Sequence, residues 1–235
     1  MINKETCILL FVKYPDKGKV KMRLSVDLNK DIVQELYRCF VQDTLATVKK
    51  IDSQLIICFL PAEAEKKFHK WLGSILLYLP QNGVDLGERM KNSFTDVFTK
   101  GFRRVVLIGS DSPDLPKKYI KQAFDILLTK DVVLGPTVDG GYYLIGFHTN
   151  SFTPSVFEDV PWGKQMVFQE TMMKIMQTHH SVGLLPIWSD VDTITDLKYL
   201  VRRAKNTSFK SSQTMTYLRK HHIQLENDCD TKTSR

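Results

Sequence analysis

The chain has 235 residues, 43% of them hydrophobic, which is enough for one ordinary globular domain with a substantial core. Its net charge of +7 could indicate that the protein binds nucleic acid, but the aromatic residues lie in apolar runs rather than between lysines and arginines. These features disfavour a nucleic-acid surface and favour a small anionic substrate, and no apolar run approaches membrane-spanning length.

The start of the chain and its cysteines indicate a reducing compartment. The first six residues are polar and lead straight into an apolar run, without the charged and apolar regions of a secretory signal. The four cysteines, Cys7, Cys39, Cys58 and Cys229, show no metal-binding spacing. We expect three of them in the core and Cys229 exposed, in a cytoplasmic protein.

Apolar runs of strand length alternate with stretches of helical period, which is typical of βα units around a mainly parallel sheet. The runs predict strands at residues 7–12, 55–59, 75–79, 105–108, 132–134, 142–147 and 182–187. The periodicity predicts helices at residues 31–50, 63–72, 86–99, 117–128, 167–178 and 194–205. Because strands that are apolar on both faces need helices on both sides, we predict an α/β fold, a three-layer α/β/α sandwich.

Two regions depart from this regular pattern. The strand-like runs within residues 132–147 are joined by a segment too short for a crossover helix, so an antiparallel element is expected there. Residues 1–205 are expected to form a single nucleotide-binding domain. Residues 206–235 are predicted to form a polar, basic tail with one short helix near residues 214–221 and disorder beyond Leu225.

A basic loop at residues 13–24 follows the first predicted strand, and polyphosphate is the natural partner of its charges. Gly18 permits close backbone approach, Lys13 and Lys21 supply point charges, and Arg23 can grip phosphate oxygens in a two-pronged fork. The loop matches neither a Walker A nor a G-x-G-x-x-G pattern, so a solvated surface loop is the alternative interpretation.

Two aspartate-rich turns follow later strands. Asp111 and Asp114 come after residues 105–108, and Asp190 and Asp192 come after residues 182–187. Open α/β sheets bind ligands at the carboxyl ends of their strands, and carboxylates there suit Mg²⁺ or Mn²⁺ bridging to a phosphate. Asp111 is predicted as a metal ligand, with Asp114 as a second ligand or as a helix cap. Capping is also the alternative for the later turn, where Thr193 begins a capping-box pattern.

Three further segments carry weaker signals. Asp85 and Arg89 are candidate nucleotide-binding residues: Arg89 on the first turn of a helix could reach an anion, and capping of that helix is the alternative for Asp85. Gly140 and Gly141 suit either a hairpin turn or a close approach by a sugar. Trp162 could line an acceptor pocket, although packing is more common for a single tryptophan.

Together these segments resemble the GT-A-like nucleotide-diphospho-sugar transferases, in particular a small bacterial and archaeal group associated with arsenosugar biosynthesis. The resemblance rests on Lys21 to Leu24, Asp85 to Met90, Gly109 to Pro116, Gly135 to Gly146 and Asp190 to Thr193, in this order. The chain departs from the family pattern at Met22, where threonine is usual, which puts one phosphate hydrogen bond in doubt, and at Gly163-Lys164.

The resemblance implies a metal-dependent glycosyltransferase that uses a nucleoside-diphosphate sugar and a small-molecule acceptor. Lys13, Lys21 and Arg23 would hold the diphosphate, and Asp111 and Asp192 would hold Mg²⁺ or Mn²⁺. The Gly140-Gly141 hairpin would face the sugar or acceptor, with Asp139 or Asp190 as the candidate general base.

Two other functions stay open. A nucleotidyltransferase would join a nucleoside triphosphate to a small phosphorylated acceptor and release pyrophosphate. The Asp-x-Pro turn, here Asp111 to Pro113, is shared with phospholactate guanylyltransferase and molybdenum-cofactor nucleotidyltransferases. A non-catalytic nucleotide-binding or partner-binding module on a retained fold is the third possibility, because one fold hosts many functions.

Overall fold

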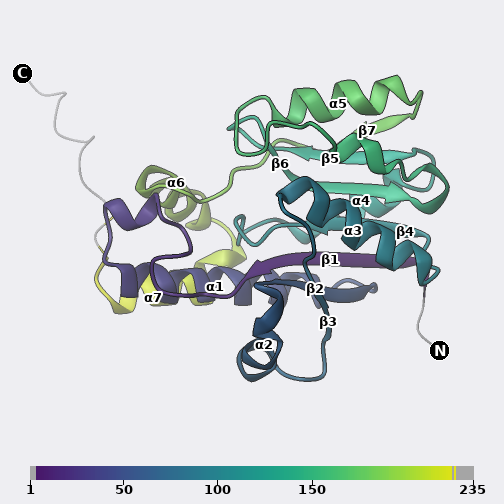
Figure 1. Ribbon diagram of the computed structural model, residues 1–235. Helices are drawn as coiled ribbons and strands as arrows, with labels where there is room; N and C mark the ends of the chain where they lie inside the picture. Colours follow the sequence, from purple (N-terminus) through teal and green to yellow (C-terminus); the bar gives the residue numbers. More distant parts are fainter. Residues whose placement is uncertain (1–3, 224, 226–235) are drawn as a thin grey trace, which may run out of the picture.

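One mixed sheet runs through the centre of the molecule (Figure 1). The structure is a computed structural model that describes residues 4–223 and 225. Within these residues seven strands form the sheet: β1 (Thr6–Lys13), β2 (Gln54–Leu60), β3 (Leu77–Pro80), β4 (Arg104–Ile108), β5 (Val132–Pro136), β6 (Tyr142–His148) and β7 (Val182–Leu184). Their order across the sheet is β3-β2-β1-β4-β6-β5-β7.

The sheet is parallel except around β6. Strand β1 pairs in parallel with β2 and β4, β2 with β3, and β5 with β7, whereas β6 runs antiparallel to both β4 and β5. The predicted antiparallel element is therefore confirmed, and it has a second partner in β4 that the sequence pattern did not identify. Because β1 and β4 are parallel neighbours, the segments that follow them emerge side by side at one edge of the sheet.

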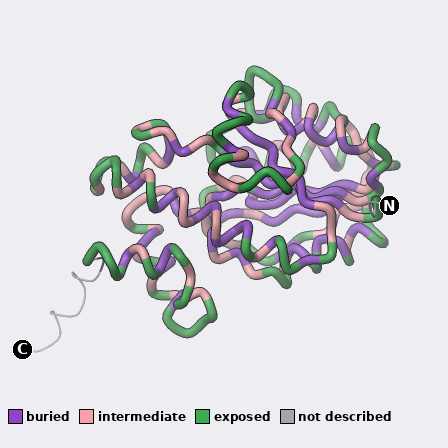
Figure 2. Tube along the Cα trace, turned by 90° about the horizontal axis from the view of Figure 1, so that it is seen from below, coloured by how far each residue is buried: buried purple, intermediate pink, exposed green. Residues whose placement is uncertain are grey.

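Helices cover both faces of the sheet. They are α1 (Lys30–Val48), α2 (Glu65–Leu72), α3 (Leu86–Thr99), α4 (Lys117–Ile126), α5 (Val167–Gln177), α6 (Ile194–Ala204) and α7 (Gln213–Lys220). On β1, Ile8 and Leu10 belong to a core cluster shared with α1, α2 and α4, and Leu9 and Phe11 to one shared with α3 and α5. Figure 2 shows the buried residues along the strands. The predicted three-layer α/β/α sandwich is confirmed.

A third core cluster lies beyond the carboxyl end of β1, where α6 and α7 pack beside α1 (Figure 1). Leu24, Phe40, Leu197 and Leu218 are among its buried residues. The Asp43 carboxylate on α1 accepts hydrogen bonds from the first two backbone N–H groups of α7, at 2.9 and 2.8 Å. The helical piece expected in a tail is thus docked on the domain.

Two strands have different bounds from those that the sequence pattern predicted. Strand β3 begins at Leu77, because the residues before it form an exposed bend. Strand β7 ends at Leu184, since Pro186 has no N–H with which to continue the ladder. The chain still follows β5, with the Trp188 N–H donating to the Pro136 carbonyl at 3.1 Å. The predictions for Cys229 and for residues 226–235 lie outside the described residues.

No helix in the described part of the chain combines the length and apolar character needed to cross a membrane. Cys7 and Cys58 are buried free thiols, as predicted for the core, and Cys39 is half-buried. Burial raises the pKa of the Cys7 thiol to about 12, so this thiol stays protonated and unreactive.

Candidate active site

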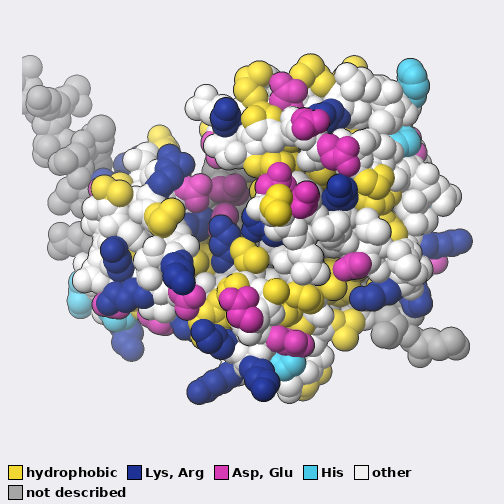
Figure 3. Space-filling view, in the orientation of Figure 1, with side chains coloured by type: hydrophobic (Ala, Val, Ile, Leu, Met, Phe, Trp, Pro, Cys, Tyr) yellow, Lys and Arg dark blue, Asp and Glu magenta, His cyan; other side chains and the backbone are white. Residues whose placement is uncertain are grey.

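A cavity of about 510 Å³ opens at the carboxyl ends of β1 and β4. Three segments that are far apart in the sequence line it: the basic loop after β1, the turn after β4, and the segment that leads into α6. Their polar lining residues are Lys13, Lys19, Lys21, Arg23, Ser110, Asp111, Ser112, Asp190 and Asp192. On the face drawn in Figure 3, basic and acidic side chains lie side by side in the hollowed middle.

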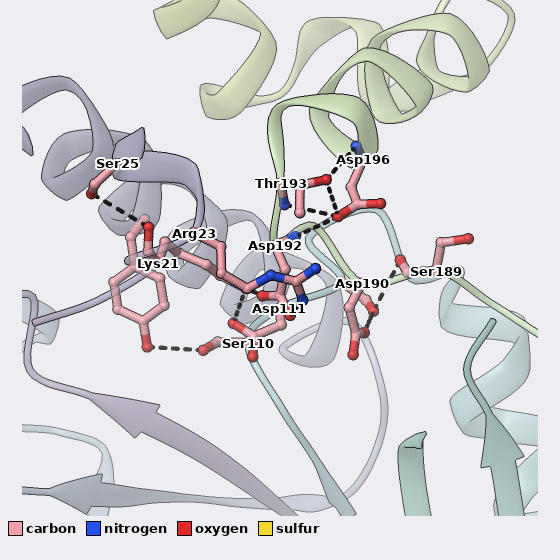
Figure 4. Close-up of polar contacts among 12 residues, drawn as sticks. Lys21, Arg23, Ser25, Ser110, Asp111, Ser189, Asp190, Asp192, Thr193 and Asp196 are labelled. Atoms are coloured by element: carbon pink, nitrogen blue, oxygen red, sulfur yellow. Dashed lines mark hydrogen bonds and ion pairs between the residues drawn. The ribbon is translucent and has the colours of Figure 1, made fainter. Parts of the chain in front are cut away.

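The centre of the site is an ion triad formed by Lys21, Asp111 and Asp192 (Figure 4). The Lys21 Nζ lies 2.6 Å from the Asp111 Oδ1 and 2.7 Å from the Asp192 Oδ1. Although burial by itself would lower it, the two carboxylates raise the pKa of the Lys21 ammonium above its ordinary value. Two of the three predicted metal ligands are therefore brought together, but around a lysine that was expected to face phosphate.

The local backbone explains this inward position of Lys21. Its backbone has a left-handed conformation, with φ of 48°, which residues other than glycine rarely adopt. Leu24 then anchors the loop, because it is fully buried in the third core cluster and opens a short 3-10 helix. Between these two points Arg23 stays 70% exposed, with its Nη1 3.9 Å from the Asp192 Oδ2. In Lys-Met-Arg-Leu the first and last side chains are thus buried, and the two between them are exposed.

Tyr37 of α1 ties the basic loop to the turn after β4, a role that the sequence analysis missed. Its buried hydroxyl accepts from the Lys13 N–H at 3.1 Å and lies 3.0 Å from the Ser110 Oγ. Burial raises the pKa of Tyr37 to about 12, so the hydroxyl keeps its proton. The available signal was a tyrosine at an inward-facing position of a helix that begins shortly after the loop.

The segment before α6 brings two more predicted residues to the cavity. The Val191 N–H donates to the Asp111 carbonyl at 2.9 Å, which holds the two aspartate-rich turns together. The Asp190 carboxylate accepts a 2.5 Å hydrogen bond from the Ser112 hydroxyl, and burial with the nearby Asp111 raises the pKa of Asp190 to about 7. The predicted capping box at Thr193 is present as well.

Asp114 has a different environment from the one that was predicted. The Arg203 guanidinium of α6 grips both of its oxygens, at 2.5 and 2.7 Å, and the Trp188 Nε1 donates to it at 3.3 Å. Asp114 is not among the residues that line the cavity. Nor does it cap α4, whose N-cap is Pro116 without a side-chain hydrogen bond. The carboxylate instead fastens α6 to the turn after β4.

The remaining predicted residues divide between the cavity and its surroundings. Asp85 caps α3 by accepting from the Glu88 N–H at 2.8 Å, which agrees with the capping alternative, and does not line the cavity. Arg89 does line it, with its Nε donating to the Asp85 carbonyl at 2.8 Å. Gly18 lies outside the lining, in a turn where it is half-buried and has a φ of 74°.

The Asp139-Gly140-Gly141 segment is a hairpin turn. The Asp139 Oδ1 accepts from the Thr137 hydroxyl at 2.5 Å and from the Gly141 N–H at 3.3 Å. Gly140 has a φ of 90°, and a Cβ there would lie 2.0 Å from the Gln165 carbonyl oxygen. None of the three residues Asp139, Gly140 and Gly141 lines the cavity, so the turn alternative accounts for them.

Trp162 packs beneath the start of α3. A Cβ at Gly87 would lie 2.5 Å from the Trp162 Nε1, so the glycine of the Asp-Leu-Gly-Glu-Arg segment is needed for this close packing. Tyr142 meets the indole edge-on, with ring centroids 6.5 Å apart. Trp162 is not part of the cavity lining, which agrees with the packing alternative.

The donor set suits a divalent cation in chemistry, with one obstacle. Asp111 and Asp192 offer hard carboxylate oxygens, and Mg²⁺ sites commonly combine one or two carboxylates with substrate phosphates. Among the described residues, no group of three or more His, Cys, Asp or Glu side chains is arranged to hold a metal by itself. The obstacle is Lys21, whose ammonium occupies the space between the two carboxylates.

Comparisons with known proteins agree with this architecture. Residues 44–164 match the family described as "Uncharacterized protein conserved in bacteria (DUF2064)". A provisionally named nucleotide-diphospho-sugar transferase from Desulfovibrio desulfuricans G20 is 44% identical, with a TM-score of 0.91 over 95% of this chain and 97% of that one. No curated protein matches the sequence.

More distant structures share the fold alone. A cytidylyltransferase from Leptospira borgpetersenii serovar Hardjo-bovis is 13% identical, with a TM-score of 0.55 over 97% of this chain and 99% of that one. A CMP:2-keto-3-deoxy-manno-octonic acid synthetase complexed with CTP is 8% identical, with a TM-score of 0.55 over 86% and 100% of the two chains.

Proposed function

Because the chain belongs to the DUF2064 family, we propose a function from its site: a metal-dependent transferase that uses a nucleoside-diphosphate sugar as donor. The observation that carries the proposal is the meeting of basic and acidic side chains in one cavity at the carboxyl ends of β1 and β4. The 44% identity to the Desulfovibrio protein, which carries a nucleotide-diphospho-sugar transferase name, supports it. The narrower likeness to the arsenosugar-associated group stays a prediction.

The donor diphosphate would lie along the basic loop. Lys13, Lys21 and Arg23 supply positive charge, and Arg23 can offer a planar fork to two phosphate oxygens. Arg89 of α3 lines the same cavity and would add a further positive charge for the donor. Charge-assisted hydrogen bonds of this kind hold a diphosphate in place and stabilise its negative charge as it leaves.

Asp111 and Asp192 would hold Mg²⁺ or Mn²⁺ once Lys21 has moved away from them. When bound, such an ion supplies electrostatic stabilisation of the departing nucleoside diphosphate. Asp190 is the candidate proton acceptor for the attacking hydroxyl group, because it lines the cavity and the Ser112 hydroxyl orients it. Asp139, the other candidate, is bound within the hairpin turn outside the cavity.

A nucleotidyltransferase is the second candidate function. Five cationic residues line the cavity, Lys13, Lys19, Lys21, Arg23 and Arg89, and this number suits a triphosphate as well as a diphosphate. The two reactions release different products from the nucleotide. Sugar transfer releases a nucleoside diphosphate, whereas nucleotidyl transfer releases pyrophosphate.

The first test is a binding survey. Thermal unfolding and calorimetry would compare UDP, GDP, CDP and ADP sugars and the matching triphosphates, each with Mg²⁺, Mn²⁺ or EDTA. A ligand at 100 times its Kd should add about 2.7 kcal/mol to the free energy of unfolding. Metal-dependent binding of one diphosphate sugar supports sugar transfer, and a preference for a triphosphate with pyrophosphate release supports the alternative. No response to any nucleotide contradicts both.

A further inference from the structure

The arrangement of Lys21 raises a question that the proposed function leaves open. The Lys21 side chain is only 4% exposed, and its ammonium contacts one oxygen from each of Asp111 and Asp192. A divalent cation held by the same two carboxylates would have to lie where this ammonium lies. Like charges at such a separation repel strongly in a partly buried site, so the lysine and the metal exclude each other.

The loop around Lys21 is built so that this side chain can leave without disturbing the core. Val20 before it is buried in the first core cluster, Met22 after it is exposed, and Lys21 itself has an unfavourable left-handed backbone. Leu24 is fixed in the third core cluster. A movement of Lys21 is therefore confined to the stretch between these two buried residues, and a change in its backbone conformation would relieve strain.

We propose that Lys21 competes with the divalent cation for Asp111 and Asp192. Its ammonium occupies this carboxylate pair until the phosphates of the nucleotide bind the ammonium instead. This inference rests on the proposed function, because it concerns how the same cavity admits its metal. Phosphate oxygens are the group that can replace the carboxylates as partners of the ammonium. Metal and nucleotide then bind with positive coupling, and metal alone binds weakly.

The test uses Mn²⁺ alone, without any nucleotide, and measures the free ion by electron paramagnetic resonance and the heat of binding by calorimetry. Lys21→Met keeps most of the length of the side chain and removes its charge. We expect this variant to bind Mn²⁺ at least about tenfold more tightly than the unaltered protein, because the competing charge is gone. Equal Mn²⁺ affinity in the two proteins would overturn the proposal.

Lys19→Met is the matched control for a general change of loop charge. Lys19 lies in the same loop and lines the same cavity, but its Nζ contacts Asp16 at 3.8 Å rather than the carboxylate pair. Its loss should change Mn²⁺ affinity by less than about threefold, because exposed charges are screened. A gain equal to that of Lys21→Met would show that only loop charge matters and would contradict the proposal.

A double variant locates the bound ion. Adding Asp111→Asn to Lys21→Met should abolish the gain in Mn²⁺ affinity, whereas a retained gain would place the ion elsewhere and overturn the proposal. If Lys21→Met fails to fold, the unaltered protein provides the test through the nitrogen-15 signal of the Lys21 ammonium. Mg²⁺ with inorganic pyrophosphate should shift that signal, and Mg²⁺ alone at the same concentration should not. The opposite pattern would contradict the proposal.

The result is separable from the proposed function. The Mn²⁺ measurement contains no nucleotide, so a protein that fails to bind every nucleotide in the survey can still show the gain in Lys21→Met. Conversely, metal-dependent nucleotide binding without that gain would leave the transferase proposal intact and remove the role of Lys21 as competitor.

Discussion

Asp111 and Asp114 belong to the same turn after β4, but their carboxylates have different surroundings. Asp111 faces the cavity, keeps 47% of its side chain exposed and shares the Lys21 ammonium with Asp192. Asp114 is 6% exposed and is gripped through both oxygens by Arg203. The first carboxylate can exchange its partner for a ligand, and the second cannot do so without loosening α6.

This contrast teaches that a motif can combine a ligand-binding residue and a structural residue of the same type. The turn Gly-Ser-Asp-Ser-Pro-Asp reads as a paired-carboxylate site, yet only its first aspartate reaches the cavity. Its second aspartate joins the turn to a helix that lies almost ninety residues later in the chain. Burial and partner, rather than residue type, separate the two roles.

The largest expected effect is on stability, at Asp114. Replacing it with alanine leaves the Arg203 charge without its partner, which should lower the free energy of unfolding by roughly 2–4 kcal/mol. This range lies below that for a fully buried ion pair because Arg203 is partly exposed. Urea denaturation measures this change. Asp111→Asn, the matched variant in the same turn, should cost less than about 1 kcal/mol because Asp192 still pairs with Lys21. Equal losses in the two variants would contradict the division of roles.

The next effect is on binding, at Arg23. Arg23→Ala removes one or two charge-assisted contacts with phosphate and should weaken nucleotide affinity by about one to two orders of magnitude. Calorimetry with the nucleotide identified in the survey measures this loss. Arg202→Ala on α6 is the control, since Arg202 is exposed and does not line the cavity. Unchanged affinity in Arg23→Ala would remove the loop from the site.

A smaller effect is expected at Tyr37, which connects the basic loop with the turn that carries Asp111. Tyr37→Phe leaves the Lys13 N–H and the Ser110 hydroxyl without a shared partner, at a cost of about 1–2 kcal/mol of stability. Tyr199→Phe changes an exposed tyrosine on α6 and should cost almost nothing. If the denaturation curves of the two variants coincide, the connecting role of Tyr37 is contradicted.

The smallest effect concerns Asp131, a carboxylate that is not part of the turn or the cavity. Hydrogen bonds from Ser151 and Ser181 lower the pKa of Asp131 to about 2. Because the folded pKa lies below the unfolded one, this contribution is present above about pH 4 and is lost as the pH falls toward 2.

Between pH 5 and 2 the free energy of unfolding, measured by denaturation, should therefore fall less steeply in Asp131→Asn than in the unaltered protein. The difference should stay below about 1 kcal/mol, because solvent screens a carboxylate that is only slightly desolvated. Parallel curves for the two proteins would show that Asp131 does not contribute.

Local patterns in the sequence were sufficient for most of the fold. The predicted bounds of α3 agree with the structure because Asp85 is a helix cap whose hydrogen bond is local. Continuous apolar runs likewise located β1 and β2. What could not be predicted depends on partners far along the chain, such as the pairing of β6 with β4 and the docking of α7 through Asp43.

The site was predicted in composition but not in arrangement. The residue types indicated that Lys21, Asp111 and Asp192 belong to one phosphate and metal site, and the structure brings these three together. Their mutual pairing depends on how a loop and a segment 171 residues apart meet in space. The same limit hid the Arg203 partner of Asp114, because side-chain pairing across a fold leaves no local pattern in the sequence.

The most direct test of the central claim is calorimetric titration of the Asp111→Asn, Asp192→Asn double variant with the preferred nucleotide, in Mg²⁺ and in EDTA. We expect the unaltered protein to bind more tightly in Mg²⁺ than in EDTA, and the double variant to lose that difference while it remains folded. A double variant that keeps the full metal-dependent affinity would contradict the assignment of this cavity as the site of transfer.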